Sequence, residues 1–256
     1  QNAVLGRANR LLAARVEKIA TSFSNLEGLP PEAAGKVEHT GMPVRSAVIE
    51  IGNRPYPPMK KNGAVKVLVI GGSQGASVFS KVVPEALGLL DEGLRAWLRV
   101  SQQCRPEDLD SVHGVYKSLG IEAELKTFFG DMPERLAAAH ILIARAGAST
   151  VAETLVAGRP AILVPYPHAI DNHQTRNAHA VDEAGAGWLM PEDSFTGPNL
   201  AARLDSLLGL PAILEKAAAS AKAAGSVDAA HRLADMVCTL LPNNGWNGPD
   251  TERRAA

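Results

Sequence analysis

A glycine-rich loop follows an apolar run in the first half of the chain. Residues 65–77 read VKVLVIGGSQGAS, so that Gly71, Gly72, Ser73 and Gln74 come directly after the apolar residues. Glycine lets the backbone adopt positive φ and approach a ligand closely. If a helix begins after the loop, its free N–H groups attract phosphate, and Ser73 adds a hydroxyl donor. The loop therefore predicts a phosphate or diphosphate site, with a turn that binds nothing as the alternative.

Two common phosphate motifs do not fit this loop. A P-loop requires Gly-Lys-Ser/Thr, and the loop has no lysine. A dinucleotide-binding loop has the pattern G-x-G-x-x-G, with an acid about 20 residues on, at the end of the next strand. Asp91 and Glu92 come before the next predicted strand, at residues 94–104, and not after it. The spacing therefore disfavours NAD as the ligand.

A second small-residue loop, RAGASTVAE at residues 145–153, also leads from an apolar run into a helical pattern. Thr150 and Glu153 have the T-x-x-E spacing of a helix capping box. A carboxylate at this position can also accept two hydrogen bonds from a ribose diol, because it has two oxygens. The pattern predicts a cap, a diol acceptor, or both.

A third loop, VPYPHAIDNHQTRNA at residues 164–178, follows another apolar run. His173 and Gln174 are neutral hydrogen-bonding groups of the kind that bind a polyhydroxylated ligand. His168, Asp171 and His173 are also candidate metal ligands, but their spacing matches no standard site. Phosphate donors, a diol acceptor and sugar-type hydrogen bonders at three such loops predict a nucleoside-diphosphate sugar as ligand.

The elements that must hold these loops alternate along the chain. Apolar runs bounded by glycine or proline predict strands, and amphipathic segments of 8 to 15 residues between them predict helices. Such alternation is typical of βαβ units in a parallel sheet, whose loops meet at the carboxyl ends of the strands. Upstream, we expect a helix over residues 3–16 and a linker over residues 52–63, which hold three prolines and two glycines.

Composition excludes several other classes of protein. The 256 residues are 46% hydrophobic and 21% charged, as in an ordinary globular protein, and the net charge of −1 gives no reason to expect nucleic acid as a partner. Cys104 and Cys238 are far apart and lack a CxxC spacing, so they indicate free thiols in a reducing compartment. No apolar stretch reaches the 18 residues of a membrane span.

Together, the three loops resemble motifs of the bacterial MurG family of glycosyltransferases. The resemblance rests on GGSQGA at 71–76, RAGASTVAE at 145–153 and PYPHAIDNHQTRNA at 165–178. QNAVLGRANRLLA at the start of the chain and GMPVR at 41–45 are also similar, although Met42 stands where the family has asparagine. The resemblance extends from residue 1 to about residue 240.

The resemblance implies an α/β fold of the GT-B type, in which two Rossmann-like domains face each other across a cleft. We expect residues 1–44 to be a remnant of the N-terminal acceptor domain and residues 45–228 to be the complete UDP-GlcNAc-binding domain. Residues 229–256 would hold a helix that crosses back, followed by a polar tail. The family's expected general base would then precede Gln1, so no catalytic residue is assigned.

The family's reaction is an inverting transfer of GlcNAc from UDP-GlcNAc to the muramoyl 4-hydroxyl of undecaprenyl-linked lipid I, which forms lipid II for peptidoglycan synthesis. The resemblance implies a peripheral enzyme on the cytoplasmic face of the bacterial membrane, without cofactor or metal. Two alternatives stay open: a UDP-binding fragment without turnover, which we expect if the acceptor domain is absent, or another GT-B nucleotide-sugar enzyme.

The resemblance also assigns roles to individual residues. Ser73 and Arg45 would contact the diphosphate, Phe128 and Phe129 would cover the uracil, and Glu153 would bind the ribose. Gln174 would bind the sugar hydroxyls, and Asn2 would face the donor sugar. The predicted binding residues are Asn2, Arg45, Gly72, Ser73, Gln74, Phe128, Phe129, Ala148, Ser149, Thr150, Glu153, His173 and Gln174.

Overall fold

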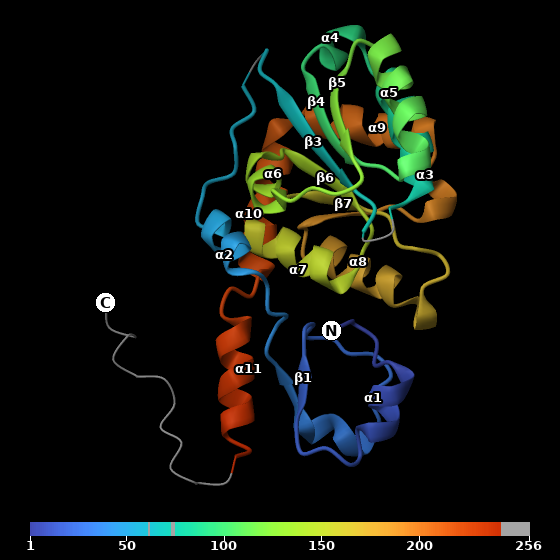
Figure 1. The fold of residues 1–256 in the computed structure, drawn as a ribbon. Coiled ribbons are helices and arrows are strands. Elements are labelled where there is room, and N and C mark those ends of the chain that lie inside the picture. Colours follow the sequence, from blue (N-terminus) through green and yellow to red (C-terminus); the bar gives the residue numbers. More distant parts are fainter. Residues whose placement is uncertain (61, 73–74, 242–256) are drawn as a thin grey trace.

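A parallel sheet forms the centre of the computed structural model, which describes residues 1–60, 62–72 and 75–241 (Figure 1). Within these residues, the sheet has six strands in the order β5-β4-β3-β6-β7-β8, and each adjacent pair is parallel. The strands are β3 (Val65–Ile70), β4 (Leu98–Gln103), β5 (Glu122–Lys126), β6 (Ile141–Ala144), β7 (Ala161–Leu163) and β8 (Gly187–Leu189). The prediction of an α/β fold with a parallel sheet is confirmed.

The strand sequences follow from their burial. The central strand β6 is a continuous apolar run, and β3 is apolar except for the exposed Lys66 near its start, because helices cover both faces of these strands. The edge strand β5 has the sequence EAELK, in which only alternate residues are partly buried. Val67 in β3 lies opposite Val100 in β4 and Ile141 in β6, which fixes the register at the centre of the sheet.

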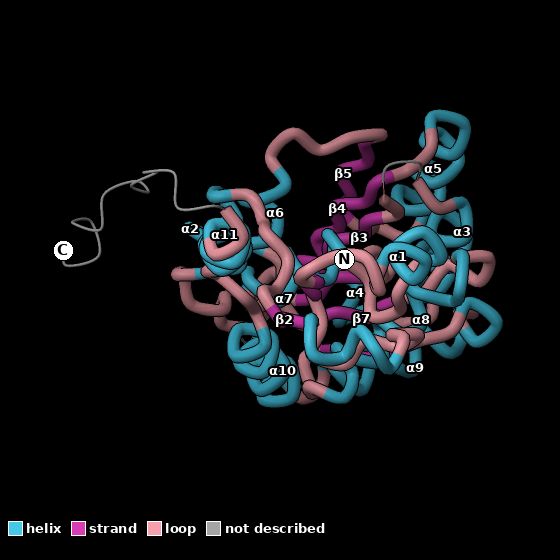
Figure 2. Tube along the Cα trace, turned by 90° about the horizontal axis from the view of Figure 1, so that it is seen from below, coloured by secondary structure: helices cyan, strands magenta, loops and turns pink. Residues whose placement is uncertain are grey.

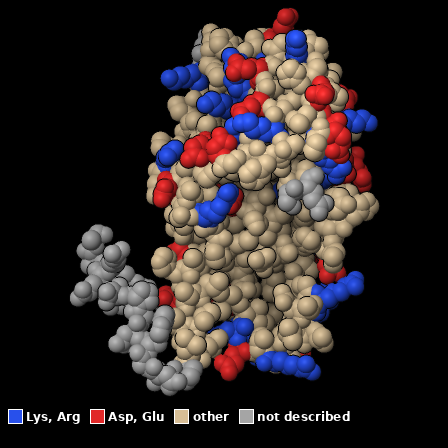
Figure 3. Space-filling view, in the orientation of Figure 1, with Lys and Arg blue, Asp and Glu red and all other residues tan. Residues whose placement is uncertain are grey.

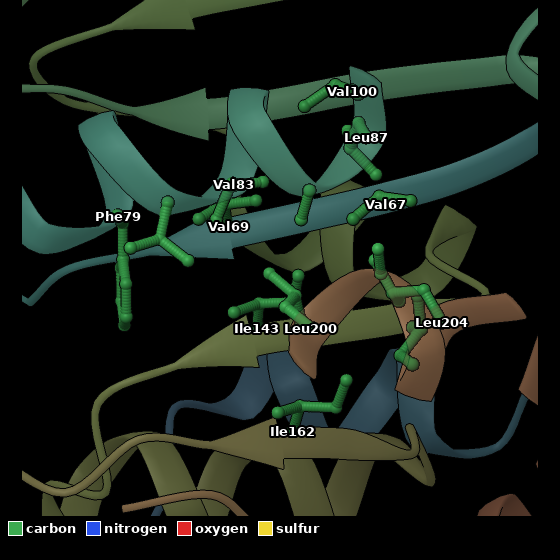
Figure 4. Close-up of a cluster of buried hydrophobic side chains, with 14 of the residues drawn as sticks. Val67, Val69, Phe79, Val83, Leu87, Val100, Ile143, Ile162, Leu200 and Leu204 are labelled. Carbon is green, nitrogen blue, oxygen red and sulfur yellow. The ribbon is translucent and has the colours of Figure 1, made fainter. Parts of the chain in front are cut away.

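Helices follow the strands and cover the sheet on two sides. They are α3 (Ser77–Gly88), α4 (Glu92–Arg95), α5 (Leu109–Ser118), α6 (Met132–Ala138), α7 (Ala148–Ala157), α8 (His173–Glu183), α9 (Gly197–Leu208) and α10 (Pro211–Ala224). Helices α3, α5 and α9 share one core with the sheet, in which Phe79, Val83 and Leu204 pack against β3 and β6 (Figure 4). Helices α6, α7 and α8 share the core on the other face. Seen from below, helices surround the strands (Figure 2).

The remaining elements lie outside the large sheet. They are α1 (Arg7–Leu12), β1 (Ile19–Thr21), the 3-10 helix η1 (Pro31–Lys36), β2 (Val37–His39), α2 (Ser46–Gly52) and α11 (Ala229–Cys238). Strands β1 and β2 form a separate parallel pair with a small core of their own. A Cβ on Gly41, which has a φ of 80°, would lie 2.5 Å from the Cβ of Ser226, so the segments before α2 and before α11 pass each other closely.

Two local predictions need correction, and one helix was missed. The helix expected over residues 3–16 is wrong in extent, because Ala3 and Leu5 are extended and exchange backbone hydrogen bonds of 2.8 Å with Glu27. The strand expected at 94–104 begins only at Leu98, since the preceding residues form α4, which Asp91 caps. Helix α2 was not predicted. Within the described residues, no helix is long and apolar enough to span a bilayer.

Candidate functional site

The order of the strands places a candidate site between β3 and β6. From β3 the chain moves outward to β4 and β5, then returns to β6 and continues in the opposite direction. Ligands of open α/β sheets bind where the strand order reverses, beyond the carboxyl ends of the strands. The loops that leave β3 and β6 are the first two loops that the sequence singled out, at residues 71–76 and 145–147. The expected position of both loops is confirmed.

A cavity of about 220 Å³ lies at this edge of the sheet. Its lining comes from the residue before α2, the loop after β3, the end of β4, the loop after β5, helix α6 and the first turns of α7. The predicted binding residues that the structure brings together here are Arg45, Gly72, Phe128, Phe129, Thr150 and Glu153. The cavity therefore joins groups predicted for the phosphate, base and ribose parts of one ligand.

The turn after β3 requires glycine at several positions. A Cβ on Gly71 would lie 2.4 Å from the backbone nitrogen of Ala76, and Gly72 and Gly75 have φ values of 84° and 68°. Helix α3 then begins after Ala76, and no side chain among the described residues caps it. A helix start of this kind attracts anions through the N–H groups of its first turn. Ser73 and Gln74 lie outside the described residues, so their predicted roles stay predictions.

The two phenylalanines after β5 have different environments. The side chain of Phe128 is exposed (75%), whereas Phe129 is buried. The guanidinium carbon of Arg135 lies 4.0 Å from the centre of the Phe129 ring. Arg135 is in turn held by Glu124, at 2.6 and 2.9 Å, and by Asp131 at 2.8 Å. Phe129 therefore anchors the loop, and the ring of Phe128 remains free to stack on a base.

These contacts also determine the charges of Glu124 and Arg135, the ion pair that supports Phe129. Hydrogen bonds from Arg135 and Lys126 lower the pKa of Glu124 to about 2. Hydrogen bonding to Glu124 in turn raises the pKa of Arg135. The ion pair that supports Phe129 therefore keeps both of its charges at neutral pH.

The capping box predicted for Thr150 and Glu153 is wrong. Helix α7 begins earlier, after Gly147, and no side chain in the described part of the chain caps it. Thr150 lies inside the helix, where its carbonyl accepts a hydrogen bond of 2.6 Å from the Thr154 hydroxyl. Glu153 instead accepts two hydrogen bonds from Arg45. Only its predicted role as a diol acceptor is still open.

Arg45 faces Glu153 across the cavity wall. Its Nε and Nη2 donate to Oε1 and Oε2 of Glu153, each at 2.8 Å. The sequence placed these two residues on different parts of the ligand, but the structure pairs them with each other. The phosphate contact predicted for Arg45 stays a prediction.

The other predicted residues of α7 lie at its first turn. Ala148 is buried and lines a different, largely apolar cavity of about 260 Å³, together with Met42, Val151 and Ser226. Ser149 is exposed. The structure therefore does not bring Ala148 into the cavity that holds Glu153.

The third predicted loop has a constrained backbone. Asp171 and Asn172 adopt left-handed φ values of 54° and 52° just before α8. Oε1 of Gln174 accepts a hydrogen bond of 3.0 Å from the backbone N–H of Tyr166, and Nδ1 of His173 lies 2.7 Å from the carbonyl oxygen of Ile170. These bonds fix both side chains, and neither side chain lines the cavity of Glu153.

The alternative metal site is not supported by the geometry. Within the described residues, no three histidine, cysteine, aspartate or glutamate side chains gather closely enough to hold a metal ion. Asp171 lies instead 3.9 Å from the Nε of Arg7, as a loose ion pair.

Asn177 is a buried residue that the sequence analysis missed. Its Oδ1 accepts the N–H of Ala3 at 2.9 Å, and its Nδ2 donates to Oδ1 of Asn2 and to the carbonyl of Ala146, each at 3.0 Å. One amide thus ties the N-terminal segment to the loop between β6 and α7, and it places Asn2 beside that loop. Its signal in the sequence is only an asparagine on the apolar side of a helix.

Arg145 is a second residue whose role the sequence did not predict. It donates to the carbonyls of Val164 and Pro165 and forms an ion pair with Glu192. Its guanidinium carbon also lies 5.3 Å from the centre of the Phe79 ring. Arg145 therefore holds the loops after β6 and β7 in place at the site edge.

Comparison with known proteins agrees with this geometry. Residues 66–233 match the glycosyltransferase family 28 C-terminal domain. The chain is 56% identical over 243 residues to the "UDP-N-acetylglucosamine--N-acetylmuramyl-(pentapeptide) pyrophosphoryl-undecaprenol N-acetylglucosamine transferase" of Paramagnetospirillum magneticum, covering 95% of the chain and 66% of that relative. A protein of the same name from Rhodospirillum centenum is 52% identical over 257 residues, covering 100% of the chain and 68% of the relative.

A solved structure gives the same result. The crystal structure of Acinetobacter baumannii MurG superposes with a TM-score of 0.78 at 25% identity, over 93% of the chain and 65% of that structure. The chain thus spans about two thirds of the length of the relatives it matches. The chain belongs to glycosyltransferase family 28, and within it to the MurG group of N-acetylglucosamine transferases.

Proposed function

We propose that the cavity between β3, β5 and α7 binds the nucleotide of UDP-GlcNAc. The observation that carries this proposal is that the cavity unites Gly72, Phe128 and Glu153, which the sequence assigned separately to phosphate, base and ribose. Phe128 supplies an exposed ring for the uracil, and the turn at Gly72 supplies close backbone approach for the diphosphate. The names of the relatives, which include UDP-N-acetylglucosamine, support the same ligand.

We further propose that the site serves transfer of GlcNAc to lipid I, which forms lipid II. The muramoyl 4-hydroxyl would attack the anomeric carbon, give its proton to a general base and displace UDP with inversion. Negative charge then develops on the leaving diphosphate, and the helix starts of α3 and α7, which no side chain of the described residues caps, are suited to stabilise it. The names of the relatives supply the acceptor in this proposal.

A surface near the N-terminus supports peripheral binding to the cytoplasmic membrane face. Leu11 and Leu12 of α1 are exposed, at 73% and 47%, and the basic residues Arg7, Arg10 and Arg15 flank them in the sequence. Apolar side chains beside arginines are suited to a bilayer surface that carries anionic lipids. Cosedimentation with anionic vesicles tests this point, and replacing both leucines with serine should reduce the bound fraction.

Calorimetric titration of the chain with UDP, UDP-GlcNAc and ADP tests the nucleotide proposal. Binding of both uridine nucleotides, with much weaker binding of ADP, would support it. Failure of UDP to bind the folded chain would contradict the site assignment. A transfer assay with a lipid I analogue, in which the donor is replaced by UDP-glucose or UDP-galactose as controls, separates this activity from that of other GT-B nucleotide-sugar enzymes.

A further inference from the structure

The largely apolar cavity of about 260 Å³ beside α7 takes no part in the proposed nucleotide site. From α7 it is lined by Ala148, Val151, Ala152, Leu155 and Val156, whereas the cavity of Glu153 is lined by Thr150, Glu153 and Thr154. Successive residues of an α-helix point about 100° apart, which places these two sets on opposite faces of α7. The two cavities are therefore separate, but they share one helix.

Five segments enclose this second cavity. Two of them come from the small unit of β1 and β2: residues 22–24 follow β1, and His39 and Met42 lie at and just after the end of β2. The other three are α7, α8 and residues 224–226 at the end of α10. Figure 1 shows α7 and α8 on the side of the large sheet that faces β1. The cavity therefore lies at the junction between the small unit and the elements of the large sheet.

Backbone contacts hold the walls of the cavity in place. The N–H groups of Thr40 and Gly41 both donate to the carbonyl oxygen of Thr21, each at 3.1 Å, so the chain after β2 is fixed against β1. A Cβ on Gly225 would lie 2.9 Å from the carbonyl oxygen of Leu155, so the chain after α10 runs directly against α7. The cavity is thus formed before any ligand arrives, which spares a ligand the cost of ordering the walls.

The lining combines apolar side chains with a few polar groups. Phe23, Met42 and Val151 contribute apolar surface, and the exposed residues Ser24 and His39 supply hydrogen-bonding groups at the opening. Met42 adds to the apolar character, because it stands where the MurG family has asparagine. Preformed, mainly apolar cavities with a few polar groups are typical binding sites for small molecules.

We propose that this cavity is a second binding site, for a compact apolar molecule with one hydrogen-bonding group, such as a bicyclic aromatic alcohol. An apolar cavity of about 150 Å³ accommodates benzene, so one of about 260 Å³ has room for two fused rings. A protein partner would need roughly 800 Å² of surface on this side, far more than a cavity of this size offers. The volume and the lining therefore favour a small molecule.

A ligand in this cavity should act on the nucleotide site through α7. It contacts Val151 and Leu155 on one face of the helix, and it thereby restrains the helix that carries Thr150 and Glu153 on its other face. When one ligand has already ordered a shared element, a second ligand binds with a smaller loss of entropy. We therefore expect the apolar molecule to tighten the binding of UDP, and UDP to tighten its binding by the same factor. This coupling, unlike the cavity itself, rests on the proposed nucleotide site.

The probe for the site is 2-naphthol, a fluorescent bicyclic alcohol of suitable size. Fluorescence titration of the 256-residue chain without nucleotide should show saturable binding of one probe per chain. Ala152→Phe fills the cavity and should abolish this binding, and circular dichroism verifies that the variant is folded. Ala219→Phe is the matched control, because Ala219 is exposed on α10, and it should leave the affinity unchanged.

Met42→Asn gives an independent readout that does not depend on filling the cavity. It restores the residue of the family and places an amide in the apolar wall. Because an apolar ligand would bury that amide without a partner, the affinity for 2-naphthol should fall by about tenfold.

Calorimetry with UDP then measures the coupling. Saturating 2-naphthol should tighten UDP by about fivefold in the unsubstituted chain and should have no effect in Ala152→Phe. Hydrogen exchange of the α7 amides should slow when the probe alone is bound.

The possible results separate the cavity from the nucleotide site. Failure of 2-naphthol to bind, or equal binding in Ala152→Phe and the unsubstituted chain, would overturn the proposed second site. Unchanged UDP affinity with the probe bound would overturn the coupling through α7. If the probe binds as expected but UDP does not bind at all, the second site stands and the proposed nucleotide site is wrong.

Discussion

Single residues of the site show how far a short pattern predicts chemistry. The T-x-x-E pattern singled out Glu153, which lines a cavity, but it predicted a cap that the structure does not have. The reason is that a capping box requires Thr150 to precede the helix, and α7 already begins at Ala148. Partners distant in the sequence, such as Arg45 for Glu153 and Asn2 for Asn177, cannot be found from local spacing, because only the fold brings them together.

Phe128 and Phe129 should respond differently to substitution. Phe128→Ala should weaken the binding of UDP by about 1 to 3 kcal/mol, which is the usual loss when a base–aromatic stack is removed. It should leave the unfolding free energy unchanged. Phe129→Ala removes a buried ring that Arg135 contacts, and should lower the unfolding free energy by about 3 kcal/mol. Calorimetry and urea unfolding of both variants measure the two effects. Loss of stability in Phe128→Ala would contradict its assignment as a free ring.

His140 should make stability depend on pH. The ring is buried, and its Nδ1 accepts the backbone N–H of Lys66 at 2.9 Å, so the folded protein requires it to be unprotonated there. Burial is the largest cause that lowers its pKa, and the charges of Lys66 and Arg159 act in the same direction against a backbone bond at Pro58. The unfolded chain, with a pKa of about 6.5, then binds the proton more tightly. The contribution of the unprotonated His140 ring to the unfolding free energy is therefore complete above a pH of about 6.5 and is lost as the pH falls below that value.

Urea unfolding at pH 7.5 and pH 5.5 checks this prediction. His140→Asn places an amide oxygen near the position of Nδ1 and should reduce the difference in unfolding free energy between the two pH values. His113→Asn is the control, because His113 is exposed on α5 and should leave the difference unchanged. An equal pH dependence in His140→Asn and the unsubstituted chain would show that another group is responsible.

At the scale of elements, the sequence predicted what depends on periodicity and missed what depends on packing. The strands β3 to β8 and helices α3 to α10 mostly follow from apolar runs and amphipathic segments. Helix α2 was missed because its seven residues, SAVIEIG, read equally well as a strand. Its helical state follows from packing, since Val48 and Ile51 are buried in the core that contains α6 and α7.

Arg159 joins two helices that frame the site. It is buried, and its guanidinium donates to the carbonyls of Leu136, Ala137, Ala157 and Gly158 at the ends of α6 and α7. Removing it leaves several buried carbonyl groups without a donor, each at a cost of about 1 to 3 kcal/mol. Arg159→Ala should therefore lower the unfolding free energy by at least about 3 kcal/mol.

The exposed arginine Arg203 on α9 gives a control for this change. Arg203→Ala should alter the unfolding free energy by less than about 0.5 kcal/mol, as surface substitutions usually do. Urea unfolding monitored by circular dichroism measures both variants. Equal stability of the two would show that the carbonyls at the helix ends find other donors.

For the whole molecule, alternation of strands and helices predicted a parallel sheet, and the sheet predicted the edge at which ligands bind. It did not predict the strand order, because the sequence does not show on which side of β3 each later strand pairs. The sequence also did not show that Glu153 and Ala148 line two different cavities. Both residues belong to one motif, and they differ only in the face of α7 on which they lie. Charged side chains gather over the upper part of the face shown in Figure 3, the middle of that face shows few, and further charged side chains lie at its lower end.

A nucleotide that bridges these segments should stabilise the whole chain. The cavity takes residues from the start of α2, from β4 and α6, from the loops after β3 and β5, and from α7, so a ligand bound there resists the separation of these segments. UDP at 100 times its dissociation constant should raise the unfolding free energy by about 2.7 kcal/mol, because only the folded chain binds it. For a chain of this size, that corresponds to a rise in melting temperature of roughly 5 to 10 °C. Pyrophosphate at the same concentration lacks the base and ribose and should give a much smaller rise. Thermal unfolding followed by circular dichroism measures both, and equal rises would mean that the base and ribose contacts of the site contribute nothing.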